Sequence, residues 1–288
     1  MRLAIISDVH SNLEALQATL DDISTQGADR IICLGDIVGY NTDPAECIAL
    51  LQKNEVACVA GNHDRAVCEQ ITTDDFGFVG ARAILWTRRR LGSEAVSFLA
   101  GLPLKAEISD ELIAVHGALH PEKGCETVRL DDDERRLQSF EALMNHPSGI
   151  RICAFGHTHR LGVFEWQDSV PRQLPGDEIN LKEGAFYLVN PGSVGESRTS
   201  DPRATYLVLD TARQAIEVKR VSYDWSVSLA KKRRAGLMPP LATLPQPLRA
   251  ALRRYLVVLG LYDAVRRRWQ VSSLGERFRH FIRSDLRH

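Results

Sequence analysis

The stretch LAIISDVHSN, from Leu3 to Asn12, joins a short apolar run to a group of polar side chains. Four consecutive apolar residues predict a strand that is covered on both faces, as in a sheet packed between other layers. Asp8 and His10 follow at once and lie two positions apart, so extended backbone directs both side chains to the same side. A carboxylate and an imidazole that converge at the end of a buried strand are candidate metal ligands.

The same arrangement recurs along the first 160 residues. Further apolar runs cover residues 31–34, 56–60, 112–115 and 150–155. The polar side chains that end or follow these runs are Asp36, Asn62, His63, Asp64, His116, His157 and His159. Because sites in α/β sheets form where strand ends and short loops converge, we expect these side chains to share one site.

Helical spacing of apolar residues between the runs predicts helices over residues 11–24, 43–53, 76–91 and 131–145. After residue 160, apolar stretches separated by turn residues predict antiparallel strands at residues 163–166, 186–189, 206–209 and 216–221. Strands that are apolar on both faces and alternate with helices predict an α/β fold in which helices cover the sheets.

The composition is that of an ordinary globular protein, with 288 residues, 44% of them hydrophobic and 25% charged. No stretch approaches the roughly 18 uncharged apolar residues that span a bilayer, so we expect no membrane partner and no export. The six cysteines form no C-x-x-C pair. We expect reduced thiols that pack as small apolar groups, with a zinc ribbon or a disulfide framework as the alternative. These features predict a cytoplasmic protein.

Charge is distributed unevenly along the chain. The formal net charge is -1, yet residues 231–288 hold 14 Lys and Arg against 3 Asp and Glu. We expect a domain over residues 1–242, on whose body residues 229–241 pack, and a basic helical C-terminal extension over residues 243–288. A solvated helical face is the favoured interpretation of the extension. Binding of nucleic acid, of an acidic partner or of another subunit is the alternative.

The donor types narrow the choice of metal. Imidazole, carboxylate and amide groups without thiolate favour Mn, Fe or Zn over Ca or a sulfur-bound zinc. Taken singly, each residue has a structural alternative, since an Asp after a strand commonly caps a helix and a lone His commonly serves packing. Five of the nine histidines fall in these strand-end positions, however. Separate structural reasons for all five are a poor joint explanation, so the sequence predicts a metal site.

Five motifs resemble, in order, the signature blocks of the calcineurin-like metallophosphoesterase superfamily. They are Asp8-Val9-His10, Gly35-Asp36, Gly61-Asn62-His63-Asp64, Val115-His116-Gly117 and Gly156-His157-Thr158-His159. The resemblance covers about residues 1–220, and the stretches SDVHSNLEAL and NPGSVG are similar to the small bacterial phosphodiesterase-like branch. It implies a four-layer α/β/β/α sandwich with two mixed β-sheets.

The resemblance also implies a centre of two divalent transition metal ions, with Mn preferred and Fe or Zn as alternatives. Asp36 would bridge the two ions. One ion would be held by Asp8, His10 and His159, and the other by Asn62, His116 and His157. Two ions held side by side stabilise both the attacking and the leaving oxygen and lower the pKa of a bound water. The implied nucleophile is metal-bound hydroxide.

Two further residues would act on the substrate. His63 resembles the family histidine that protonates the departing alkoxide, and Asp64 would orient and charge-stabilise its imidazole. A hydrogen-bonded structural histidine is the alternative. Asn12 and Arg65 are substrate-binding candidates, for which turn geometry and a surface ion pair are equal alternatives. The remaining loop candidates are Tyr40, Asn41 and Arg198.

The block from Gly35 to Tyr40, GDIVGY, departs from protein Ser/Thr phosphatases and bacterial diadenosine tetraphosphatases, which carry an arginine after the bridging aspartate. We therefore expect hydrolysis of small, nucleotide-like phosphodiesters or phosphomonoesters. A dinucleoside polyphosphate hydrolase or a protein phosphatase is the enzymatic alternative. An interaction scaffold of the same fold is the non-enzymatic one, but it predicts eroded ligands, and here none is eroded.

Overall fold

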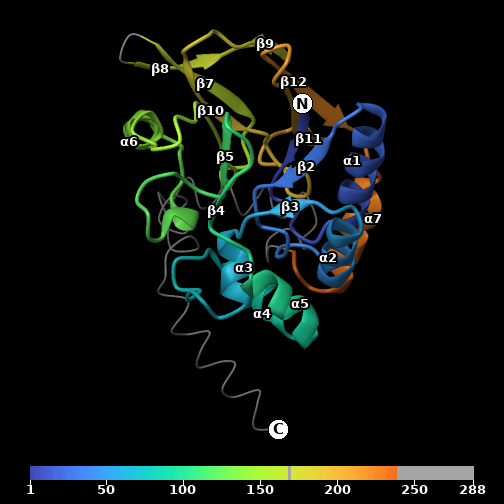
Figure 1. Cartoon of the computed structure of the whole chain (residues 1–288). Coiled ribbons are helices and arrows are strands. Elements are labelled where there is room, and N and C mark those ends of the chain that lie inside the picture. Colours follow the sequence, from blue (N-terminus) through green and yellow to red (C-terminus); the bar gives the residue numbers. More distant parts are fainter. Residues whose placement is uncertain (168–169, 239–288) are drawn as a thin grey trace, which may run out of the picture.

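The computed structural model describes residues 1–167 and 170–238. Two six-stranded mixed sheets pack face to face, and helices cover both outer faces (Figure 1). The predicted four-layer α/β/β/α sandwich is thereby confirmed. The predicted extension over residues 243–288 and the domain boundary at residue 242 lie outside the described residues and stay predictions.

The first sheet has the strand order β3-β2-β1-β11-β12-β9. Its strands are β1 (Arg2–Ile6), β2 (Arg30–Cys33), β3 (Ala57–Cys58), β9 (Glu178–Asn180), β11 (Ala204–Asp210) and β12 (Ala215–Val221). β1, β2 and β3 are parallel, whereas β11, β12 and β9 are added antiparallel, each to its neighbour. The carboxyl ends of the three parallel strands therefore lie at one edge.

The second sheet has the order β4-β5-β6-β10-β7-β8. Its strands are β4 (Lys105–Glu107), β5 (Leu112–Val115), β6 (Ile152–Ala154), β7 (Gly162–Gln167), β8 (Val170–Leu174) and β10 (Phe186–Asn190). β5, β6 and β10 are parallel. The antiparallel arrangement predicted after residue 160 thus holds with one exception, because β10 pairs with β6 in parallel.

Most helices pack on the outer side of the first sheet. They are α1 (Leu13–Thr25), α2 (Pro44–Lys53), α3 (Asn62–Val67), α4 (Phe78–Arg88), α5 (Ser93–Ala100) and, against α1, α7 (Trp225–Arg234). On the other side α6 (Asp133–Met144) covers the second sheet, after a short 3-10 turn, η1 (Cys125–Thr127). In the described part of the chain, no helix has the length and apolar character needed to cross a membrane.

Alternate side chains of the central strands face different layers. Leu3 and Ile5 of β1 face the second sheet, whereas Ala4 and Ile6 face the helices, and all four are fully buried. A buried aliphatic side chain stabilises the fold by about 1.5–3 kcal/mol. The predicted strands are apolar at every position because both of their faces are covered.

The predicted helices correspond to α1, α2, α4 and α6, with ends shifted by a few residues. The sequence did not predict α3, α5 and α7, or the strands β4, β8 and β9. The missed strands are three to five residues long and largely exposed, so they carry no burial pattern. Leu237, beyond α7, is buried. This agrees with the expected packing of residues 229–241 on the body, as far as the structure describes them.

Candidate metal centre

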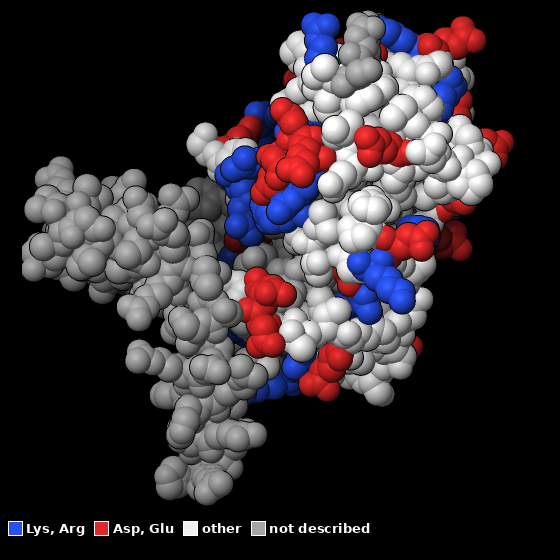
Figure 2. Space-filling model, turned by 90° about the vertical axis from the view of Figure 1, so that its left-hand side faces the viewer, with Lys and Arg blue, Asp and Glu red and all other residues white. Residues whose placement is uncertain are grey.

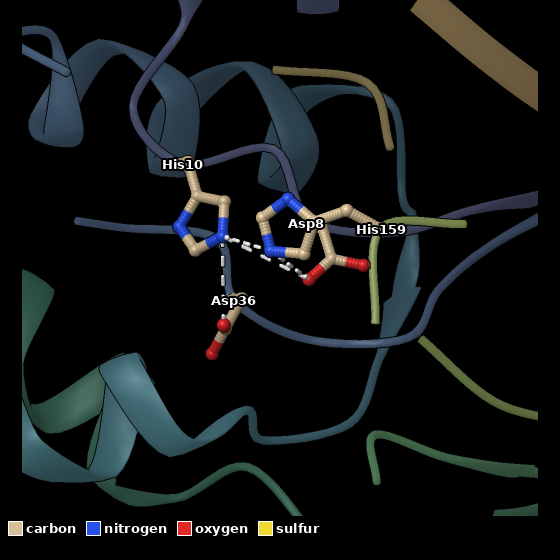
Figure 3. A group of neighbouring side chains, drawn as sticks. All are labelled: Asp8, His10, Asp36 and His159. Atoms are coloured by element: carbon tan, nitrogen blue, oxygen red, sulfur yellow. Dashed lines mark hydrogen bonds and ion pairs between the residues drawn. The ribbon is translucent and has the colours of Figure 1, made fainter. Parts of the chain in front are cut away.

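The loops that leave the parallel strands hold the predicted ligands. Asp8 and His10 follow β1, Asp36 follows β2, and His159 follows β6. One ligand atom from each of these residues lies within 4.8 Å of all the others, and all four residues are buried. Figure 3 shows the four side chains pointing toward one another. The structure thus brings together the first predicted group of ligands.

A second group lies beside the first. Ligand atoms of Asp36, His116 and His157 lie within 4.8 Å of one another. Asn62 joins them, with its Oδ1 3.1 Å from Nε2 of His116. Asp36 belongs to both groups, because its Oδ2 is 3.5 Å from Nε2 of His10 and 3.4 Å from Nε2 of His116. A carboxylate between two sets of imidazoles has the placement of a bridging ligand.

Backbone carbonyls fix the tautomer of three imidazoles. The distances from Nδ1 to the carbonyl oxygen are 3.1 Å for His10 with Val38, 2.7 Å for His116 with Leu34 and 2.5 Å for His159 with Glu196. Because a carbonyl only accepts, each Nδ1 carries the proton, and Nε2 of a neutral ring presents a lone pair. The Nε2 atoms of His10 and His159 are 3.1 Å apart. Two lone pairs this close repel each other unless a cation lies between them.

Burial sets the charge of three imidazoles and of Asp8, whereas at His116 burial is outweighed by the nearby charge of Asp36, which raises the pKa to about 9. Burial lowers the pKa of His10 and His157 well below the usual range, and that of His159 to about 3, so that all three rings are neutral at pH 7. Burial also raises the pKa of Asp8 to about 7, and no described residue hydrogen-bonds to its Oδ1. Neutral imidazoles and an unpartnered carboxylate oxygen, all buried, fit divalent cations.

The ligand-bearing loops adopt an uncommon backbone conformation. The φ angle lies between 49° and 63° at Asp8, His10, Asp36, His157 and His159. This left-handed region costs a non-glycine residue roughly 1–2 kcal/mol. The surrounding fold imposes this conformation against local preference, as is typical of functional sites.

Two glycines allow the loops to approach closely. A Cβ at Gly61 would lie 2.1 Å from Oδ1 of Asp36. At Gly39, where φ is +104°, a Cβ would lie 2.4 Å from Nδ1 of His63. Both positions therefore exclude any side chain. Glycine stands at these positions of the GNHD and GDIVGY motifs because Asp36 and His63 occupy the space that a side chain would need.

His63 faces the centre from α3. Its backbone N–H donates to Oδ1 of Asp36 at 2.8 Å. Its ring packs against Phe76, Tyr40 and His10, with centroids 5.0, 4.7 and 4.8 Å away. Burial lowers its pKa to about 4. Within residues 1–167 and 170–238, no group hydrogen-bonds to either ring nitrogen. Packing thus fixes the ring and buries Nδ1 against Gly39, so Nε2 is the nitrogen left for a ligand.

Asp64 is placed differently from its expected role. Its Oδ1 accepts from the N–H of Val38 at 3.1 Å and its Oδ2 from the N–H of Gly61 at 2.9 Å. Adjacent residues on a helix do not face each other, so at the third position of α3 the carboxylate turns back to the helix start and away from His63. The expectation that Asp64 orients His63 is therefore corrected, because Asp64 instead joins the GDIVGY loop to the GNHD turn.

Asn12 and Arg65 both have partners within the protein. Asn12 caps α1, with its Oδ1 accepting from the N–H of Ala15 at 3.2 Å and its Nδ2 donating to the carbonyl of Gly195 at 2.9 Å. Arg65 forms an ion pair with the buried Glu126. These contacts correspond to the structural alternatives, and substrate contact by either residue stays a prediction.

Three loop candidates lie around the centre. The ring of Tyr40 is 4.6 Å from that of His10, and Arg198 donates from Nη2 to the Tyr40 hydroxyl at 3.1 Å. Asn41 donates from Nδ2 to the carbonyl of His10 at 2.9 Å, so it holds a ligand loop in place.

Sequence reasoning missed two residues that support the site. Glu196 supplies the carbonyl that accepts from His159. Lys232 of α7 donates to both carboxylate oxygens of Glu196, at 2.8 and 3.0 Å, and is itself 9% exposed. The position of Glu196 next to the NPGSVG motif was a usable signal, whereas Lys232 stands in a basic run where no pattern marks it.

Known proteins are similar to this chain in sequence and in fold. The chain is 37% identical over 230 residues to an uncharacterised protein of Methanocaldococcus jannaschii, covering 77% of this chain and 88% of that protein. A solved metallophosphoesterase from Sphaerobacter thermophilus is similar with a TM-score of 0.68 and 30% identity, over 86% of this chain and 97% of that one.

The fold is shared more widely. A hypothetical protein from Pyrococcus horikoshii OT3 aligns with a TM-score of 0.63 and 18% identity, covering 82% of this chain and 94% of that one. Residues 1–214 match the domain described as the calcineurin-like phosphoesterase superfamily domain. This match includes all seven predicted ligands. The chain belongs to the calcineurin-like phosphoesterase superfamily.

Proposed function

We propose that the protein is a dinuclear metal-dependent phosphoesterase that hydrolyses small, nucleotide-like phosphodiesters or phosphomonoesters. The observation that carries the proposal is the 3.1 Å contact between Nε2 of His10 and Nε2 of His159, both of which have their proton on Nδ1. Oδ1 of Asp8 lies 3.2 Å from the second of these nitrogens. A cation converts this repulsive arrangement into a set of ligands, and membership of the superfamily supports hydrolysis of phosphoesters.

The two groups of side chains would hold two ions, with Asp36 common to both. The proposed ligands are Asp8, His10 and His159 for one ion, and Asn62, His116 and His157 for the other. When bound, two divalent ions supply Lewis-acid stabilisation of the phosphoryl oxygens and lower the pKa of an attacking water. We propose Mn as the metal, with Fe or Zn as alternatives, because the donors are nitrogen and oxygen without thiolate.

His63 would protonate the leaving group from its Nε2. Its ring is held by Phe76 and Tyr40, and Nδ1 lies against Gly39. A bound phosphoryl anion favours the protonated ring, because an opposite charge nearby raises the pKa of an imidazole. Tyr40 stands in the loop after Asp36 where protein phosphatases carry arginine, so we propose small substrates rather than phosphoproteins.

We also propose a cytoplasmic location. The six cysteines are free thiols, four buried and two half-buried. Thiols persist in this form in reducing compartments.

A metal and substrate panel tests the proposal. Protein stripped with chelator is supplied with Mn, Zn, Fe(II) or Mg and assayed on bis-p-nitrophenyl phosphate, p-nitrophenyl phosphate, 2',3'-cyclic nucleotides and diadenosine tetraphosphate. We expect two equivalents of bound metal and turnover of a small phosphoester. Asp36→Asn should lose both, whereas His146→Ala, which lies outside the centre, should lose neither. Absence of both metal uptake and turnover in the wild type would favour the scaffold alternative.

A further inference from the structure

Arg198 brings a positive charge next to the metal centre. It lies on the loop between β10 and β11, and its side chain is exposed. Besides donating to the Tyr40 hydroxyl, it lies over the Tyr40 ring, with Cζ 5.4 Å from the centroid. The same ring packs on His10 and His63 at 4.6 and 4.7 Å. One aromatic ring therefore separates the guanidinium group from a predicted ligand and from the proposed proton donor.

This charge has no carboxylate partner within ion-pair distance in the part of the chain that the structure describes. Glu196, two residues away, is bound by Lys232 at 2.8 Å instead. By contrast, acidic and basic side chains are intermixed on the face of the molecule that carries α6, as Figure 2 shows, and three arginines there pair with carboxylates. The paired arginines at α6 and the loop before it are Arg129, Arg135 and Arg136.

The guanidinium group of Arg198 and the metal centre lie on opposite sides of the Tyr40 ring. An anion between Arg198 and the metal centre would interact favourably with both. Nε and Nη1 of Arg198 have no described partner. A guanidinium group with free N–H donors suits bidentate binding of phosphate oxygens.

We propose that Arg198, held by Tyr40, binds a second anionic group of the substrate, such as the further phosphate of a nucleoside diphosphate. The inference rests on the proposed phosphoesterase function and specifies its substrate class. The Tyr40 ring lies between Arg198 and the predicted ligand His10, whereas the ring of His63 packs directly on His10. The position of Arg198 therefore favours contact with a group adjacent to the scissile phosphoryl over contact with the scissile phosphoryl itself. The chain would then prefer substrates whose leaving group carries negative charge.

The test compares AMP and ADP, which differ by one phosphate, on the Mn-loaded protein. Both are used as inhibitors of bis-p-nitrophenyl phosphate hydrolysis and as ligands in isothermal titration calorimetry. We expect the wild type to bind ADP more tightly than AMP. Arg198→Ala should weaken ADP binding about tenfold or more, while AMP binding and hydrolysis change by less than about threefold. Arg198→Lys should recover part of the ADP affinity.

Arg203→Ala is the matched control, because Arg203 lies on the same loop but is paired with Asp201 at 2.6 Å. It should behave as the wild type. Unchanged ADP affinity in Arg198→Ala, or equal losses for ADP, AMP and hydrolysis, would overturn the assignment of Arg198. A wild type that takes up no metal and hydrolyses no phosphoester would instead overturn the proposed function, so the two failures are distinguishable.

Discussion

Among the five imidazoles of the centre, His63 differs in that neither ring nitrogen has a hydrogen-bond partner within the described residues. Its place is set by packing against Phe76 and Tyr40. A residue that transfers a proton without holding metal contributes to the rate and not to metal affinity. General acid catalysis typically contributes about 10²–10⁴-fold.

His63→Ala should therefore lower kcat by about 10²–10⁴-fold and leave the metal content at the wild-type value. Metal analysis and steady-state kinetics on the same preparation measure the two effects. His146→Ala, at a histidine outside the centre, is the control and should change neither. Parallel loss of metal and turnover in His63→Ala would make His63 a ligand.

The types of ligand could be predicted from the sequence, but their supporting contacts could not. Asp8, His10 and Asp36 stand at recognisable strand ends. The carbonyls of Val38, Leu34 and Glu196 that fix the imidazole tautomers belong to the backbone. Every residue has a carbonyl, so no side-chain pattern marks these acceptors. The same limit applies to Asp64, whose partners are two backbone N–H groups.

At the scale of elements, α7 is connected to the centre through one buried lysine. Lys232 binds the Glu196 carboxylate, and the Glu196 carbonyl accepts from Nδ1 of His159. Lys231, its neighbour on the helix, binds Glu14 and Asp43 instead, away from the ligands. Substitutions at the two lysines can therefore distinguish a general contribution of α7 to folding from a specific contribution of Lys232 to the metal centre.

Lys232→Met should weaken metal binding about 10–100-fold, the usual effect of losing a group that orients a ligand. Lys231→Met should leave metal affinity unchanged. Competition with a chromogenic chelator measures both, and thermal unfolding shows whether each variant folds. Equal effects of the two substitutions would mean that α7 acts only through folding.

Strands β7 and β10 share a buried carboxylate. Glu165 accepts from the Tyr187 hydroxyl at 2.7 Å and from the Lys182 ammonium at 2.9 Å. Burial raises the pKa of Glu165, but these hydrogen bonds outweigh burial, so its pKa lies below the usual range. A lowered pKa stabilises the fold above the pKa of the unfolded chain, and the contribution is lost as pH falls through the folded pKa.

Glu165→Gln should therefore lower Tm at pH 7. The difference in Tm between the variant and the wild type should shrink as pH falls from about 5 to about 3. Calorimetry at several pH values measures the difference. Glu178→Gln is the control, because the pair of Glu178 with Arg213 is exposed on both sides and contributes little. A difference that stays constant over this pH range would contradict the proposed charge effect.

The order of the principal elements also followed from the sequence, whereas their membership of the two sheets did not. The runs at β1, β2, β5 and β6 are apolar at every position because both faces are covered. Short exposed strands such as β8 and β9 lack this pattern. Parallel pairing of β10 with β6 is decided by which strands become neighbours in the folded chain, which no local pattern encodes.

For the whole molecule, metal binding should couple to stability, since the two groups of ligands are complete only in the folded chain. Metal at 100 times its dissociation constant stabilises a protein by about 2.7 kcal/mol, or roughly 5–10 °C in Tm for a chain near this size. Thermal unfolding with and without Mn tests this shift. Asp36→Asn should abolish it, and an unchanged Tm in the wild type would argue against a structured metal site.

The left-handed backbone of the ligand residues affects how the chain changes under mutation. Glycine at Asp8, His10, Asp36, His157 or His159 would relieve strain of roughly 1–2 kcal/mol while removing a ligand. The relief of strain would offset part of the stability lost with the buried side chain, whereas metal binding would lose a ligand outright. We therefore expect such replacements first in a chain that no longer binds metal, and in this chain all seven predicted ligands are present.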